Sequence, residues 1–427
     1  MYLSASRAAD AATGVRQRGK APRRGRTVRR AVAGNVVALG MVSLVTDVSA
    51  EMVTAVLPLY LVVGLGMSPL AFGALDGLQQ GATALFRLAG GHVADRTHRR
   101  KLVAGTGYAL SAGCKLVLLA VTTPWAIGAV LAADRTGKGL RTAPRDALIS
   151  LSSPPEEQGR AFGVHRAMDT AGALLGPVAA FAVLWAARDG YDAVFMVSFC
   201  VAAFGVLLLG LFVRDIRTAS PQDGARKPRE PGALRAALRA LVGNRGLTRL
   251  CLTAALLGVV TVSDSFVYLL LQQRLDLPVQ YFPLLPVGTA AGFLLLAVPA
   301  GLLADRMGRL GVFLVGHGAL LAAYLLLLLP GGGGWLPALS VLALLGAFYA
   351  ATDGVLMAAA GPLLPEGLRA SGLALVQTVQ AVARFVGALL FGAGWTYWGP
   401  GGAVAGAAVG LTVSLAAVAA LTMRSRA

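Results

Sequence analysis

The chain has 427 residues, of which 56% are hydrophobic and only 14% are charged, and its formal net charge is +18. Soluble domains carry roughly a quarter charged residues, so this composition excludes an ordinary soluble globular protein. The excess of positive charge is compatible with nucleic-acid binding, but the basic residues are spread over the breaks between apolar runs and form no single soluble face. We therefore expect a membrane protein that binds no nucleic acid.

The first 30 residues are rich in arginine and hold one acidic residue, Asp10. The apolar stretch that follows runs from about residue 31 to residue 65 and contains Asp47 and Glu51. It is too long for the apolar core of a cleaved signal peptide. We expect a disordered basic tail, residues 1–30, followed by an uncleaved first membrane helix. The tail is interpreted as an orientation and lipid-surface signal, with partner binding as the alternative.

Long apolar runs recur along the rest of the chain. Many exceed the roughly 18 residues that a helix needs to cross about 30 Å of hydrocarbon. We count twelve predicted helices, with spans 33–63, 70–90, 102–122, 125–149, 161–186, 191–213, 247–271, 283–303, 311–329, 336–358, 371–395 and 401–423.

Basic residues predict which ends of these helices are cytoplasmic. The even-numbered breaks hold arginine and lysine, whereas the odd-numbered breaks hold almost none, and bases near helix ends mark the cytoplasmic side. Both termini and the Pro-rich segment after the sixth helix are therefore predicted to be cytoplasmic, in the inner membrane of a prokaryote. The predicted parts are a tail (1–30), a six-helix bundle (31–213), a cytoplasmic linker (214–246), a second six-helix bundle (247–423) and a second tail (424–427).

A ten-residue pattern occurs twice at half-chain spacing. GHVADRTHRR at residues 91–100 returns as GLLADRMGRL at residues 301–310, which predicts two similar halves. We expect the repeat to act as a conformational gate, in which Asp95 and Asp305 meet a helix N-terminus or an arginine of a neighbouring helix. The first copy has His98 where the second has Gly308. The gate candidates are Gly91, Asp95, Arg96, Gly301, Asp305, Arg306 and Arg309.

Six helices, a basic linker, six more helices and this paired turn resemble the major facilitator superfamily over residues 31–423. Gly172, Gly176 and Pro177 resemble the GxxxGP motif in the fifth helix of the superfamily's exporters and mark a hinge there, while Arg135 stands where its fourth helix has an arginine. The segment GKGLRTAPRDAL resembles a prokaryotic branch whose substrates are mostly unassigned. The resemblance implies an all-α membrane fold of two pseudo-symmetric bundles and alternating access, often coupled to protons.

The fourth helix carries four basic residues that share one face. It must continue through Arg135, Lys138, Arg141 and Arg145 to cross the membrane, and these fall within an arc of about 120°. One interpretation is a cationic stripe that lines a cavity and attracts an anionic solute, because bases facing lipid are costly. The alternative is that only Arg135 and Lys138 lie deep while the other two extend toward the headgroups.

Carboxylates in the membrane helices are candidates for proton coupling. Asp47 and Glu51 lie one turn apart in the first helix, and Asp169 lies in the fifth. Closely spaced, poorly hydrated carboxylates tend to hold a proton unless a basic side chain lies close to them. One of these carboxylates can therefore bind and release a proton. The alternative is a static role as ion-pair partners. Further candidates for the substrate cavity are Arg166, Asp264, Tyr268, Gln377, Gln380 and Arg384.

Enzyme motifs are absent from the sequence. There is no HExxH, P-loop, CxxC or GxSxG pattern, so we expect no enzyme, no metal site and no cofactor beyond a proton gradient. We predict a monomeric secondary transporter, a proton-coupled antiporter that exports a small, anionic or drug-like organic solute. The alternative is a proton symporter that imports an anionic metabolite or metal chelate. A membrane sensor or a lipid-handling protein is the alternative from another class.

Overall fold

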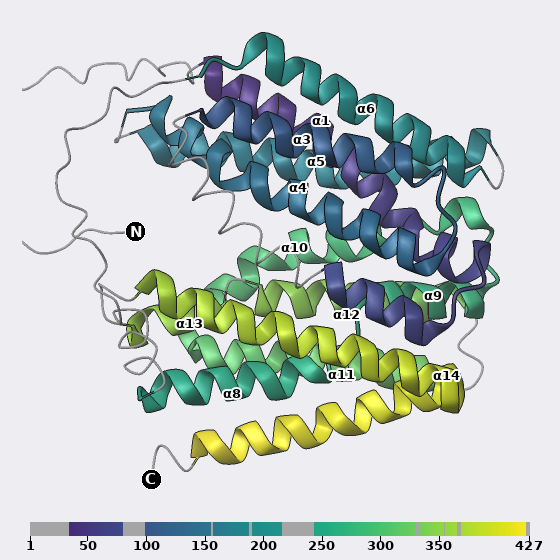
Figure 1. Cartoon of the computed structure of the whole chain (residues 1–427). Helices are drawn as coiled ribbons and strands as arrows, with labels where there is room; N and C mark the ends of the chain where they lie inside the picture. The colour runs from purple at the N-terminus through teal and green to yellow at the C-terminus, as the bar shows by residue number, and fades with distance from the viewer. Residues whose placement is uncertain are drawn as a thin grey trace, which may run out of the picture. The chain divides into compact units, whose positions relative to one another are not determined.

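We describe the fold from a computed structural model. It describes residues 34–79, 99–154, 157–187, 190–215, 243–329, 334–353, 355–364 and 369–423. Every regular element in these ranges is a helix, and no strand occurs in them (Figure 1).

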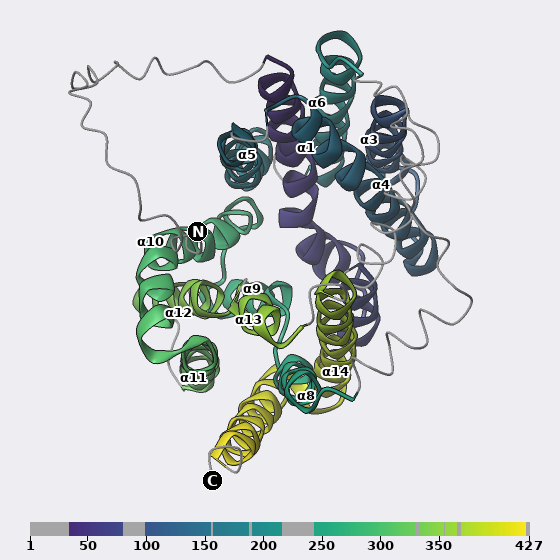
Figure 2. The same ribbon diagram turned by 90° about the vertical axis from the view of Figure 1, so that its left-hand side faces the viewer.

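The first group of helices packs around α1. Its members are α1 (Gly34–Leu59) with a π-helical turn (Tyr60–Gly64), a helix at 69–79, α3 (Arg100–Val117), α4 (Pro124–Leu151), α5 (Gln158–Ala186) and α6 (Tyr191–Phe212). Contacts join α1 to α5 and α6, and α3 to α4 and α6 (Figure 2). This group corresponds to the first six predicted helices.

The second group packs in the same manner. Contacts join α10 to α12, α11 to α12 and α14, and α8 to α14. Its members are α8 (Arg245–Val259), α9 (Asp264–Leu275), a 3₁₀ turn (Val279–Tyr281), α10 (Leu284–Met307), α11 (Arg309–Leu328), α12 (Trp335–Thr352), α13 (Val355–Ala360), a 3₁₀ turn (Gly361–Leu363) and α14 (Arg369–Met423).

Helices stand at all twelve predicted spans, the second of them described only over residues 69–79. Among the described residues, eight helical stretches are long and apolar enough to cross a membrane. The predicted tails and most of the linker, residues 216–242, lie outside the described residues, so the bundle boundaries stay a prediction.

The prediction of continuous helices was wrong at two places. The helix predicted at 247–271 is divided between Val259 and Asp264, and the one predicted at 336–358 is divided after Thr352. The residues at 260–263 are Val-Thr-Val-Ser, so neither glycine nor proline marks the break. Non-helical backbone at membrane depth is tolerated only where protein buries it or where it borders a cavity.

The second repeated turn is shorter than predicted. α10 runs to Met307 and α11 begins at Arg309, so Gly308 alone connects them. Its φ of 85° lies in the left-handed region, which a residue with a Cβ rarely adopts. Gly399, with φ 74°, likewise bends α14 at the predicted break between the last two helices.

Aromatic side chains join the two groups at one end of the helices. Phe72 meets Phe266 of α9 with ring centroids 5.0 Å apart. Tyr281 contacts Phe181 and Trp185 of α5, with centroids 5.7 Å and 6.1 Å away. These contacts lie at the end that carries the connections at 65–68 and 276–283 (Figure 1). The two groups are therefore packed together at this end, which the charge pattern predicts to be extracellular.

Candidate functional site

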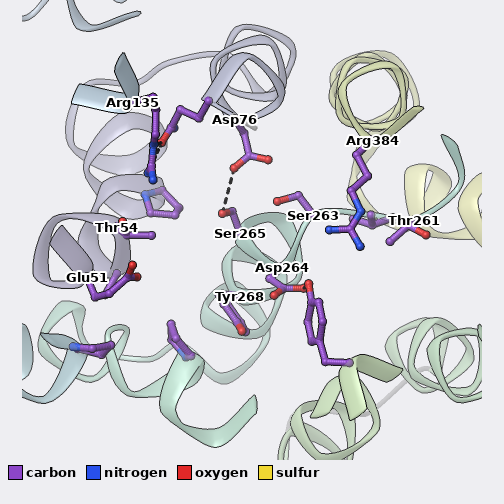
Figure 3. Close-up of a pocket in the computed structure, with 17 residues that line it drawn as sticks. Glu51, Thr54, Asp76, Arg135, Thr261, Ser263, Asp264, Ser265, Tyr268 and Arg384 are labelled. Carbon is purple, nitrogen blue, oxygen red and sulfur yellow. Dashed lines mark hydrogen bonds between the residues drawn. The ribbon is translucent and has the colours of Figure 1, made fainter. Parts of the chain in front are cut away.

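A cavity of about 510 Å³ lies between the two groups of helices, and both groups line it. Its walls come from α1, the helix at 69–79, α4 and α5 on one side, and from the 260–263 segment, α9, α10, α12 and α14 on the other. Figure 3 shows side chains from these elements pointing into the same space. Five lining residues carry a formal charge: Glu51, Asp76, Arg135, Asp264 and Arg384.

Arg135 is held by an amide from the neighbouring helix. Its Nε and Nη2 donate to Oε1 of Gln79 at 3.2 Å and 2.7 Å. α4 begins at Pro124, so Arg135 stands about 16 Å along it at 1.5 Å per residue, near the middle of a bilayer. The guanidinium therefore reaches the cavity in a defined orientation.

Asp264 enters the cavity because the helix predicted at 247–271 is broken between α8 and α9. It is the first residue of α9, where a carboxylate suits the positive end of the helix dipole. The Tyr349 hydroxyl, from α12, donates to its Oδ1 at 2.9 Å. One turn further along α9, the hydroxyl of Tyr268 donates to Oγ1 of Thr289 at 3.0 Å.

Asp76 makes a hydrogen bond between the two groups of helices. Its Oδ1 accepts from the Ser265 hydroxyl of α9 at 3.3 Å (Figure 3). Its Oδ2 is buried and, within the described part of the chain, has no hydrogen-bond partner. Among the described residues, no ion pair involves Asp76.

Two further cavities of about 320 Å³ each adjoin the first and share lining residues with it. One is lined by Asp264, Tyr268 and Glu51. The other is lined by Gln377, Gln380 and Arg384, which share one face of α14 as their spacing predicts. The polar space thus extends from the central cavity toward α13.

The bases of α4 differ from the expected stripe, because only Arg135 lines the central cavity. Arg141 is 3% exposed, which excludes both a cavity position and extension to the headgroups. Its Nη2 lies 3.1 Å from Oδ1 of Asp47, and its guanidinium carbon lies 4.5 Å above the Tyr108 ring. The partner acid lies on α1, so the spacing of the bases along α4 could not indicate it.

The remaining bases of α4 also meet acids. Arg145 Nη1 lies 3.7 Å from Oδ1 of Asp169 in α5, and the Ser43 hydroxyl donates to the same carboxylate at 2.8 Å. Lys138 Nζ lies 3.9 Å from Oε1 of Glu51, a long contact in which both side chains are about one third exposed. The three predicted proton-coupling acids therefore each face a base of α4.

Other predicted site residues lie outside the cavity. Arg166 is exposed on α5. Residues 91–96 and the Asp305 side chain lie outside what the structure describes, so the gate stays a prediction. Gly301 and Arg306 are exposed, while Arg309 donates to the carbonyl of Ala358 at the end of α13.

The predicted hinge in α5 is a close contact with α1. A Cβ at Gly172 would stand 2.4 Å from the Leu44 carbonyl oxygen, and one at Gly176 would stand 2.6 Å from Glu51 Cβ. Pro177 follows and lines the cavity. The two glycines thus let α5 approach the backbone of α1 on the face that carries Glu51.

Several cavity residues were missed from the sequence. Gln79, Thr261, Ser263 and Ser265 are small or neutral, and nothing in their spacing distinguishes them from other polar residues of membrane helices. Tyr349 has a polar hydroxyl within an apolar run, and this feature of the sequence could have indicated a cavity residue. Among the described residues, no group of three or more histidine, cysteine, aspartate or glutamate side chains could hold a metal ion.

Chemically, the described residues around this cavity offer charged groups and hydrogen-bonding groups. Carboxylates, guanidinium groups, hydroxyls and an amide converge on the cavity between two groups of helices. These side chains can bind a polar solute and exchange protons with it. Their distances from one another change if the two groups of helices move relative to each other.

Comparisons with known proteins agree with this architecture. The sequence pattern of the Major Facilitator Superfamily matches residues 39–388. An uncharacterised MFS-type transporter of Methanocaldococcus jannaschii is 29% identical over 382 residues, which cover 86% of this chain and 89% of that protein.

Two solved structures share the fold. The nucleoside transporter NupG superposes with a TM-score of 0.76 at 16% identity, covering 91% of this chain and 98% of that one. A POT family transporter in complex with 5-aminolevulinic acid superposes with a TM-score of 0.71 at 14% identity, covering 91% and 96%. The chain is therefore a multi-pass membrane transporter and not an enzyme, and it belongs to the Major Facilitator Superfamily.

Proposed function

We propose that this transporter moves a small polar organic solute through the cavity between its halves by alternating access, as a secondary active carrier. The observation that carries the proposal is one cavity to which both halves contribute charged side chains. A charged side chain facing lipid at mid-bilayer costs about 2.5–3.5 kcal/mol or more. Five such side chains around one space are expected to border water and solute.

We further propose that protons drive transport and that Glu51 carries them. Glu51 lines the cavity, and its only ion-pair partner among the described residues is Lys138, at the long distance of 3.9 Å. Asp47, 3.1 Å from Arg141, is held in a closer pair, and Asp169 is held by Ser43 and Arg145. We assign those two acids the static ion-pair role.

The direction we propose is export across the cytoplasmic membrane, in exchange for protons. The resemblance of Gly172, Gly176 and Pro177 to the exporter motif supports it, and these residues pack against the helix that carries Glu51. We expect a monomer in the bilayer, with both termini cytoplasmic, that uses the proton gradient and no bound cofactor.

The test uses purified protein in liposomes and a solute that raises its melting temperature. If the lumen is made acidic, the wild type incorporated inside-out should accumulate the solute against its gradient. Glu51→Gln should lose this accumulation yet keep solute–solute exchange, because an amide cannot carry the proton.

Asp192→Asn is the matched control, since this exposed carboxylate lies in the first turn of α6. It should behave as wild type. Accumulation by Glu51→Gln at the wild-type rate, or transport that ignores the pH gradient, would exclude proton coupling through this residue.

A further inference from the structure

Two charged groups in the cavity are incompletely satisfied by hydrogen bonds and ion pairs to the described residues. Arg384 is half-buried on α14, and among the described residues it makes neither a hydrogen bond nor an ion pair. Asp76 accepts one hydrogen bond at Oδ1, and its buried Oδ2 has no hydrogen-bond partner among the described residues. Unpaired charged groups are costly in a membrane interior, so each is expected to meet a partner that is not part of the protein.

The other charged groups of the cavity are already engaged. Arg135 donates twice to Gln79, Glu51 faces Lys138, and Asp264 accepts from Tyr349. Among the described residues, the buried oxygen and the guanidinium that lack such a partner are therefore Oδ2 of Asp76 and the guanidinium of Arg384. A solute that satisfies both must carry an acidic group and a basic group.

The two unpaired groups belong to different halves of the protein. Asp76 comes from the helix at 69–79, and Arg384 comes from α14 (Figure 3). A solute with one charge can neutralise only one of them, and so contacts one half by ion pairing. A solute with both charges binds the two halves at once, which is the differential contact that a change between two states requires.

We propose that the transported solute is a small zwitterion. Its carboxylate or phosphate pairs with Arg384, and its ammonium group pairs with Asp76, near the Asp264 carboxylate. This inference rests on the proposed function and names its substrate class. It replaces the anionic solute that the bases of α4 suggested, because three of those four bases face acids of α1 and α5. The cavity volume of about 510 Å³ lies within the range of small-molecule sites.

The first experiment measures binding to the purified full chain by thermal shift. The probes are the amino acids, a set of dipeptides and 5-aminolevulinic acid, each beside its N-acetyl form and its methyl ester. At least one zwitterion should raise the melting temperature, and both of its blocked forms should bind at least tenfold more weakly. The proposal is overturned if no zwitterion binds, or if a blocked form binds as tightly as its parent.

The second experiment assigns the two charges. In Arg384→Gln the methyl ester should bind as well as the zwitterion, because the guanidinium that favours a free carboxylate is gone. In Asp76→Asn the N-acetyl form should bind as well as the zwitterion, because the carboxylate that favours a free ammonium group is gone. The exposed matched controls, Arg249→Gln and Asp192→Asn, should keep the wild-type preference. Arg384→Lys keeps the charge and should stay within about tenfold of wild type, which separates a lost ion pair from a misfolded protein.

Transport of the same probes into liposomes separates this inference from the proposed function. If zwitterions bind but no probe crosses, the proposed function fails and the assigned site stands. If a purely anionic or neutral solute crosses while zwitterions neither bind nor cross, the transporter stands and the assigned substrate class fails.

Discussion

Arg141 is a cation in the interior of a membrane protein, and its surroundings explain how it is accommodated. Asp47 neutralises it at 3.1 Å, and the Tyr108 ring covers its guanidinium at 4.5 Å. Such a pair adds little net stability over apolar residues of the same size, but breaking it leaves an uncompensated buried charge. The residue is therefore expected to fix the contact between α1 and α4.

We predict that Arg141→Gln and Asp47→Asn each lower the melting temperature of the purified protein markedly. Removing one partner of a buried pair costs about 3–5 kcal/mol. The double variant should lose less stability than the sum of the two single variants, with a coupling of about 0.5–3 kcal/mol, because neither charge is then left alone. Additive losses in the double variant, or single variants that melt as wild type but do not bind solute, would instead make Arg141 a substrate contact.

The sequence identified the charged residues but not their partners. The positions of Arg135, Lys138 and Arg141 on α4 follow from spacing alone. Whether a base faces solute or acid depends on which helix packs beside it, and spacing within one helix carries no such information. Spacing therefore left Asp47 and Glu51 equally open to proton coupling or to a static ion pair, whereas α1 presents Asp47 to Arg141 and presents Glu51, one turn away, to the cavity.

At the scale of elements, the break between α8 and α9 shapes the cavity. Tyr324 of α11 braces it: its hydroxyl accepts from the Val262 amide at 2.8 Å and donates to the Val260 carbonyl at 3.3 Å. Backbone groups released from a helix in a membrane must find such partners, since lipid offers none. The braced segment presents Thr261 and Ser263 to the cavity.

We predict that Tyr324→Phe destabilises the protein by about 1–3 kcal/mol and weakens solute binding, because a buried amide loses its acceptor. The measurements are the melting temperature and the solute dissociation constant. Tyr108→Phe is the matched control, since the Tyr108 hydroxyl is buried without a hydrogen-bond partner. It should have little effect on either quantity. Equal effects of the two variants would show that the hydroxyl of Tyr324 has no special role.

The break itself could not be predicted from the sequence. Val260, Thr261 and Val262 continue the apolar run, and none is a residue that breaks helices. The break is stabilised by the Tyr324 hydroxyl of α11, some 60 residues away. The sequence predicts that α11 is a helix, but it does not predict that α11 packs against this segment. By contrast, Gly399 followed by Pro400 marked the bend in α14 directly, because both residues act through the local backbone.

At the scale of the whole molecule, the two halves meet around a polar cavity and pack together at one end. Aromatic rings from both halves make this contact, among them Phe72 with Phe266 and Phe181 with Tyr281. Ring contacts of this kind can separate and re-form without leaving a charge unpaired. The fold class, the number of spans and the half-chain repeat could be predicted because they depend on the lengths of the apolar runs and on the spacing of repeated motifs. Which residues line the cavity depends on contacts between the two halves, which the sequence alone does not give.

The central claim is that the charged side chains border a hydrated passage, and a cysteine placed in the cavity tests it most directly. Thiolates react with membrane-impermeant methanethiosulfonates, and a thiol surrounded by lipid remains protonated and inert. The background replaces the free cysteines Cys114, Cys200 and Cys251. Thr54→Cys lies in the cavity, and Val298→Cys, 71% exposed on α10, is the lipid-facing control.

We predict that the cysteine at position 54 reacts from the cytoplasmic face at least a hundredfold faster than the one at position 298. Reaction from the outer face should be slow, because the aromatic contacts pack the halves together there, and a bound solute should slow labelling from either face. A cysteine at position 54 that reacts from neither face, or no faster than the lipid-facing control, would contradict the claim.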